Sequence, residues 1–86
     1  MKLSELKNQV QNFDKKAGWD KTEFSQLVGF MQEELDHLKL SANNKDRVNH
    51  LLTDLLVLIM QTAYRYNTDF SSELEKWFKS AEQEIK

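Results

Sequence analysis

The sequence predicts an all-α fold, most simply a four-helix antiparallel bundle made by one domain over residues 1–86. The chain has 86 residues with no proline and only two glycines, and proline is the commonest helix breaker. Apolar residues recur every three or four positions through four successive segments, which is the period of an α-helix. Loops of a few polar residues separate these segments, and short loops join antiparallel neighbours in helical bundles.

The first two helices are bounded by start and stop signals. The first begins near Ser4 and ends at Gly18, because glycine commonly terminates a helix. The second begins at Asp20, which we interpret as the N-cap because Glu23 follows three residues later as in a capping box, and it ends near Leu40. The apolar face of the first helix comprises Leu3, Leu6, Val10, Phe13 and Ala17, and that of the second Phe24, Leu27, Val28, Met31, Leu35 and Leu38.

The third helix is the most apolar part of the chain. It follows a polar loop at residues 41–44 and runs from about Lys45 to Tyr66. The stretch from Leu55 to Met60 makes it hydrophobic nearly all round, so we expect it to be central or to lie at a subunit interface. A turn at residues 67–69 precedes the fourth helix, whose apolar positions are Phe70, Leu74, Trp77, Phe78, Ala81 and Ile85.

Composition narrows the classes of function. Apolar residues make up 40% and charged residues 30% of the chain, which fits a folded globular protein. A net charge of −2 argues against nucleic-acid binding, and the absence of cysteine excludes disulfides, thiolate catalysis and zinc fingers. No apolar run is long enough for a membrane span or a signal peptide, so we expect a cytoplasmic protein without membrane contact. A chain of this size has a thin core, which favours a homodimer or a larger homo-oligomer.

Polar residues that fall on apolar faces are the informative exceptions to this pattern. Glu34 points into the middle of the apolar face of the second helix, with Glu33 beside it and His37 one turn further. The third helix carries a single polar stripe formed by Arg47, His50, Asp54, Gln61 and Arg65. An inward carboxylate needs a cation, a metal ion or a proton, because an unpaired buried charge is very unfavourable.

Two interpretations of these residues remain open. In the first, Glu34 pairs with an arginine, and the stripe on the third helix is an ion-paired or solvated surface. In the second, Glu34 and Asp54 face each other across two helices and hold a divalent cation, while Arg47 or Arg65 binds phosphate oxygens. Mg²⁺ prefers oxygen ligands, whereas the two histidines would suit Mn²⁺ or a later transition metal.

Two motifs extend the second interpretation. They are Glu33-Glu34-Leu-Asp-His37 on the second helix and His50-Leu51-Leu-Thr-Asp54, which stands directly before the apolar run of the third helix. Together with Trp19-Asp20 and Asp69-Phe70, they make the chain from about Phe13 onward resemble the MazG-like all-α nucleoside triphosphate pyrophosphohydrolases. The resemblance implies metal-dependent hydrolysis of a nucleoside triphosphate to the monophosphate and pyrophosphate, with Mg²⁺ or Mn²⁺ between two helices and with bundle helices shared in a dimer.

The resemblance also implies a set of site residues. Glu34 and Asp54 would be catalytic, the metal ligands would be Glu33, Glu34 and Asp54 with His37 and His50 as candidate substitutes, and the substrate-binding residues would be Arg47, Arg65, Trp19, Lys76 and Lys79. Trp19 would stack on a base. Lys76 and Lys79 flank the position of a basic residue that members often carry on the last helix.

The chain departs from the family pattern at two acids. His37 stands where the family has the last glutamate of EExxE, and Leu51 stands where it has the glutamate of ExxD. Loss of anionic ligands weakens a Mg²⁺ site. One alternative is therefore a catalytically degenerate member that serves as a nucleotide-binding or protein-interaction module, and a third reading is an unrelated structural bundle or coiled-coil adaptor.

Overall fold

The computed structural model describes residues 1–85, and this part of the chain is all-α without a β-strand. Four helices follow one another: α1 (Leu3–Ala17), α2 (Phe24–Lys39), α3 (Lys45–Arg65) and α4 (Phe70–Glu84). The predicted all-α class and the four predicted helices are confirmed within residues 1–85, whereas the single chain does not close a four-helix bundle. Within residues 1–85, no helix has a stretch both long and apolar enough to cross a membrane.

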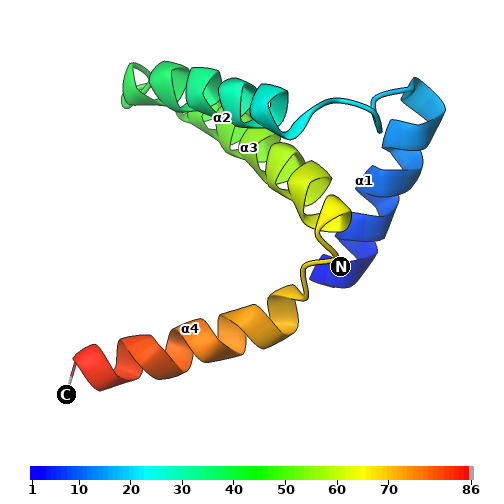
Figure 1. The fold of residues 1–86 in the computed structure, drawn as a ribbon. Coiled ribbons are helices and arrows are strands. Elements are labelled where there is room, and N and C mark those ends of the chain that lie inside the picture. The colour runs from blue at the N-terminus through cyan, green and yellow to red at the C-terminus, as the bar shows by residue number, and fades with distance from the viewer. Residues whose placement is uncertain (86) are drawn as a thin grey trace.

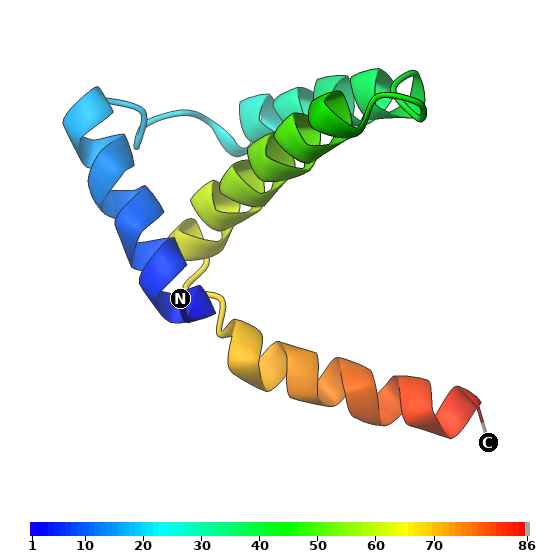
Figure 2. The ribbon, with the colours of Figure 1, turned by 180° about the vertical axis from the view of Figure 1, so that it is seen from behind.

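Helices α2 and α3 form an antiparallel hairpin and lie side by side in both views (Figures 1 and 2). The Ser41 hydroxyl closes the end of α2 by donating a hydrogen bond of 2.7 Å to the carbonyl oxygen of His37. Asn44 then caps α3, because its side-chain oxygen accepts a hydrogen bond of 3.1 Å from the Arg47 amide. This tight connection sets the register in which the polar residues of the two helices meet.

Helix α3 is the centre of the molecule, as its composition predicts. It contacts both α2 and α1, whereas α1 and α2 do not pack on each other. The buried apolar side chains of the described residues are Val10 from α1, Leu27 from α2, and Leu51, Met60 and Ala63 from α3. Gly18 ends α1 with φ of 76°, a left-handed conformation that glycine adopts without strain, so the predicted stop is confirmed.

The predicted start of α2 at Asp20 is wrong. The helix begins at Phe24, and Glu23 occupies the N-cap position, with its amide donating a hydrogen bond of 3.0 Å to Oε1 of Gln26. Asp20 is exposed in the connection that precedes it. The reason is a turn in which the Thr22 amide donates to the carbonyl oxygen of Trp19 at 3.1 Å, so helical hydrogen bonding starts only after that turn.

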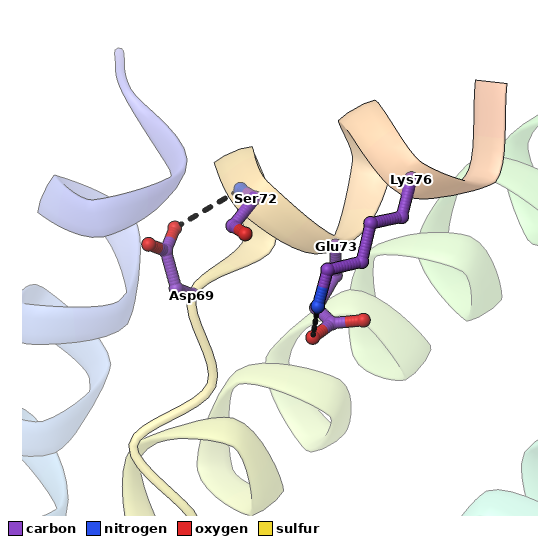
Figure 3. A network of polar contacts seen from close by, with 4 residues as sticks. All are labelled: Asp69, Ser72, Glu73 and Lys76. Atoms are coloured by element: carbon purple, nitrogen blue, oxygen red, sulfur yellow. Dashed lines mark hydrogen bonds and ion pairs between the residues drawn. The ribbon is translucent and has the colours of Figure 1, made fainter. Parts of the chain in front are cut away.

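Helix α4 leaves the other three helices and projects away from them (Figures 1 and 2). Asn67 adopts a left-handed conformation with φ of 51°, and the Thr68 amide donates to the carbonyl oxygen of Ala63 at 3.0 Å, which closes the end of α3. Asp69 then caps α4 by accepting a hydrogen bond of 3.2 Å from the Ser72 amide (Figure 3). Among residues 1–85, α4 contacts only α1, so the single chain has a three-helix core with α4 outside it.

Candidate functional site

The carboxyl groups of Glu34 on α2 and Asp54 on α3 face each other across the helix hairpin. Burial raises the pKa of Glu34 above its usual 4.5, and the neighbouring Asp54 carboxyl group raises this pKa further. The Oε2 atom of Glu34 is buried, and no group within residues 1–85 donates a hydrogen bond to it. Two adjacent carboxyl groups cannot both ionise comfortably, so such a pair must share a proton or a cation.

Two histidines near the acid pair oppose the rise in the pKa of Glu34. His50 lies one helical turn from Asp54, with its Nε2 atom 3.3 Å from Oδ2 of Asp54. The positive charges of His37 and His50 lower the pKa of Glu34, although less than burial and Asp54 raise it. In the described part of the chain, no three His, Asp or Glu side chains are arranged so that they could hold a metal ion together. The two facing carboxyl groups are therefore the core of the candidate site.

A cleft of about 550 Å³ opens beside the acid pair, between α2 and α3. One end of the cleft is acidic, because Glu33 lines it together with the facing pair. The other end is formed by Trp19, Thr22 and Gln61, and the side chains between the two ends are mainly apolar. Asp54 and Gln61 are seven residues apart on one face of α3, which places the two ends about 10.5 Å from each other along the helix axis.

Trp19 lies at the mouth of the cleft. Its ring packs edge to face against Phe13 with 5.5 Å between the ring centroids, yet the residue remains 52% exposed. Trp19 therefore has exposed surface at the end of the cleft that is away from the acids.

Arg65 contacts the connection between α1 and α2. Its guanidinium group donates hydrogen bonds to the carbonyl oxygens of Thr22 and Trp19, the second at 3.2 Å. It therefore holds the connection between α1 and α2 against the end of α3, and it does not line the cleft. Within residues 1–85, no arginine forms an ion pair with Glu34 or Asp54, so the structure does not support the arginine-pair interpretation.

The remaining candidate phosphate-binding residues lie away from the cleft. Arg47 is exposed in the first turn of α3. Lys76 and Lys79 are exposed on α4, where Lys76 pairs with Glu73 at 3.4 Å (Figure 3) and Lys79 pairs with Glu75 at 3.5 Å. The structure thus brings Glu33, Glu34, Asp54 and Trp19 together around one cleft. His37 and His50 act on Glu34 from outside the cleft lining, and the three basic residues also lie outside it.

Leu51 belongs to the core and not to the cleft. Its side chain is only 2% exposed and belongs to the apolar core that α3 forms with its neighbours. A glutamate at this position would bring a charge into that core without a partner. In this chain the position therefore stabilises the fold, and Asp54 is the acidic residue that α3 offers to the cleft.

Sequence reasoning missed a buried acid, Asp14, which is only 1% exposed. Its Oδ1 atom accepts a hydrogen bond of 3.0 Å from Nε2 of Gln61, and its Oδ2 atom accepts one of 2.8 Å from the Tyr64 hydroxyl. Burial, and then the hydrogen bond to Asp14, raises the pKa of Tyr64. The signal was present, since Asp14 lies four residues after the buried Val10 on the inward face of α1.

The candidate site thus consists of an acid pair at one end of an apolar cleft, and of the Trp19 ring and the Gln61 amide at the other end. No family model, curated protein or solved structure matches this chain at a significant level.

Proposed function

We propose that this chain binds a nucleoside triphosphate through a divalent cation held by Glu34 and Asp54, and hydrolyses it to the monophosphate and pyrophosphate, as the MazG-like enzymes that it resembles do. The observation that carries the proposal is the buried, unpartnered Oε2 atom of Glu34 opposite Asp54. Mg²⁺ is commonly bound through one or two carboxylates plus substrate phosphates, with water completing its shell. Two facing carboxyl groups beside a cleft suit this mode of binding.

The residues around the cleft have distinct roles in this proposal. Glu34 and Asp54 hold the cation, which when bound would neutralise phosphate charge and activate a water molecule. Glu33 adds negative charge at the same end of the cleft. His50 holds the Asp54 carboxylate in place through the 3.3 Å contact. Trp19 offers its exposed ring to the base at the other end.

A second candidate function is nucleotide binding without hydrolysis. It is favoured by the burial of Leu51 and by the lack, within residues 1–85, of a third acidic or histidine side chain placed to complete a metal site. Fewer anionic ligands mean weaker cation binding and less stabilisation of the transition state. Binding and turnover must therefore be measured separately.

The test combines metal-dependent thermal stabilisation with an assay of pyrophosphate release. We expect Mn²⁺ or Mg²⁺ to raise the melting temperature of the wild-type chain, because a ligand that binds only the folded state stabilises it. Glu34→Gln and Asp54→Asn should abolish this rise. Asp36→Asn, which changes an exposed carboxylate on α2 outside the cleft, is the matched control and should retain it.

The two candidate functions then separate by turnover. Release of pyrophosphate from any nucleoside triphosphate, lost in Glu34→Gln and kept in Asp36→Asn, supports hydrolysis. Nucleotide binding with the same dependence on Glu34 but without pyrophosphate supports the binding module. A wild-type chain that neither cation stabilises, and that neither binds nor hydrolyses a nucleotide, would refute both.

We further propose that a second copy of this chain covers α4. Its large apolar side chains are exposed in the single chain, with Trp77 at 61% and Phe78 at 58%. Exposed apolar residues also follow α3, namely Leu52, Leu56 and Ile59. Large apolar side chains left exposed on two helices are typical of a protein interface, and a homodimer would complete the predicted four-helix bundle with helices from both copies.

Sedimentation equilibrium over a range of concentrations tests this assembly. We expect a dimer for the wild-type chain and dissociation in Trp77→Glu, because a charge cannot be buried there without a partner. Gln83→Glu places the same charge at another exposed position of α4 and should leave the dimer intact. A wild-type chain that remains monomeric at every concentration would overturn this proposal.

A further inference from the structure

Gln61 is a buried amide at the end of the cleft opposite the acid pair. It is only 8% exposed, and it lines the cleft together with Trp19 and Thr22. Its Nε2 atom donates a hydrogen bond of 3.0 Å to Oδ1 of Asp14 on α1. Gln61 thus connects the buried acid of α1 to the ligand cleft of α2 and α3.

Asp14 determines which way the Gln61 amide points. A carboxylate can only accept hydrogen bonds, so Gln61 must offer its NH₂ group to Asp14. The Tyr64 hydroxyl donates to the second carboxylate oxygen at 2.8 Å, which completes the pairing of Asp14 without involving Gln61. The opposite orientation of the amide would place two oxygen acceptors against each other in a buried position, which is strongly unfavourable.

The carbonyl oxygen Oε1 of Gln61 is consequently left as an acceptor. No group in residues 1–85 donates a hydrogen bond to it, and it is not among the enclosed polar atoms. Because the residue is more than nine-tenths buried and lines the cleft, the cleft is the side from which a ligand would reach this oxygen. Leu27 and Leu58 also line the cleft and are apolar. In such surroundings a ligand without a hydrogen-bond donor would leave Oε1 of Gln61 unpaired, so the site discriminates against it.

We propose that Gln61 selects the nucleobase by accepting a hydrogen bond from a base N–H at its Oε1 atom, and that Asp14 is the residue that positions it. The inference rests on the proposed nucleotide function and adds a specificity-determining residue to it. Phosphates bound at the acid pair direct the base toward Gln61, about 10.5 Å further along α3. The base then lies between the open ring of Trp19 and the Gln61 amide.

The experiment compares three ligands in the presence of Mn²⁺ by isothermal titration calorimetry. They are the nucleoside triphosphate that binds most tightly, its analogue in which the base N–H is methylated, and inorganic triphosphate, which has no base. The wild-type chain should bind the first at least about tenfold more tightly than the second, because a polar site rejects a ligand that lacks the matching donor. This comparison needs no substitution in the chain.

Three variants then assign the selection to the two residues. Gln61→Leu should remove the difference between the nucleotide and its methylated analogue and leave the affinity for inorganic triphosphate unchanged. In Asp14→Asn, the new side-chain NH₂ group can donate to Oε1 of Gln61, so the Gln61 amide is free to adopt the opposite orientation. This variant should weaken or invert the preference for the unmethylated nucleotide. Tyr64→Phe removes the other hydrogen bond to Asp14 and is the matched control, so it should keep the preference of the wild type.

The outcomes separate this inference from the function on which it rests. If inorganic triphosphate binds in a manner that depends on Glu34, but the methylated analogue binds as well as the parent nucleotide, the role of Gln61 is refuted and the metal site stands. If Asp14→Asn and Tyr64→Phe change the preference equally, Asp14 has a structural role only. If neither inorganic triphosphate nor any nucleotide binds with Mn²⁺, both the function and this inference are overturned.

Discussion

The imidazole Nε2 atom of His50 lies 3.3 Å from Oδ2 of Asp54, one helical turn along α3. The pair is partly exposed, so by itself it contributes little to stability. Its position gives it another effect, because the charge of His50 lowers the pKa of Glu34 on the facing helix. The proton affinity of the acid pair therefore depends on a residue of α3 that is outside the pair.

Replacing His50 by asparagine should raise the pKa of Glu34 further. The substitution removes a positive charge that favours the ionised carboxylate. The measurement is a pH titration of the Glu34 side-chain carboxyl carbon by nuclear magnetic resonance. Arg47→Gln removes a charge from the exposed first turn of α3 and serves as the control. An unchanged midpoint in His50→Asn would show that the imidazole does not act on the pair.

Glu34→Gln should stabilise the metal-free chain at neutral pH. The folded-state pKa of Glu34 is raised above the usual 4.5, so the folded state holds this proton more strongly than the unfolded state does. The contribution of Glu34 to the free energy of unfolding is therefore complete below pH 4.5 and is lost as pH rises through the folded-state pKa. Urea denaturation in the presence of a chelator should show that the free energy of unfolding of Glu34→Gln, relative to that of the wild type, increases from pH 4 to pH 7.

The exposed carboxylate of Asp36 again provides the comparison for this pH series. Asp36→Asn should show no such gain, because its side chain is outside the cleft and faces solvent. Addition of Mn²⁺ should reverse the order at pH 7, since the cation stabilises the wild type and not Glu34→Gln. A Glu34→Gln chain that is less stable than the wild type at neutral pH would mean that the carboxylate has a stabilising partner.

Replacing the two glycines by alanine should change the free energy of unfolding in opposite directions. A Cβ atom meets no neighbour within 4 Å at either position, so packing does not decide the result. Gly18 has φ of 76°, and Gly18→Ala should lower the free energy of unfolding by about 1–2 kcal/mol. Gly29 lies inside α2, and Gly29→Ala should raise it by about 0.5–1 kcal/mol. Chemical denaturation measures both, and equal effects at the two sites would contradict this account.

Tyr64→Phe should lower the free energy of unfolding by about 1.5 kcal/mol, because it removes a hydrogen bond to the buried Asp14 carboxylate. Burial and this hydrogen bond raise the pKa of Tyr64 above 10.0 in the folded state. Its contribution is therefore present below pH 10 and declines as pH rises further. Denaturation at pH 7 and pH 11 should show a smaller difference at the higher pH, whereas Tyr66→Phe, at an exposed tyrosine, should change little at either.

The helix hairpin and its acid pair could be predicted from the sequence because both follow from periodicity. A rotation of about 100° per residue places Glu34 on the inward face of α2, and a short loop makes α3 its antiparallel neighbour. Those two facts bring Glu34 and Asp54 together without any knowledge of the remaining packing. Whether the pair holds a cation stays a prediction.

Other contacts leave no comparable trace in the sequence. Arg65 donates to main-chain oxygens of Thr22 and Trp19, and every residue type has such an oxygen. The direction of α4 depends on the left-handed conformation of Asn67, whereas periodicity shows only that the helix is amphipathic. Asp14 differs from these contacts, because its spacing of four residues from Val10 does indicate an inward position on α1.

The attachment of the α1–α2 connection by Arg65 has a practical consequence for protein engineering. Because the guanidinium group binds main-chain oxygens, the path of this connection does not require particular side chains at the residues it holds. Thr22 lines the cleft from this connection, and its neighbours Asp20 and Lys21 are exposed. A randomised library over these three positions would diversify the entrance for ligands on a constant scaffold, with Arg65 as the one side chain to preserve.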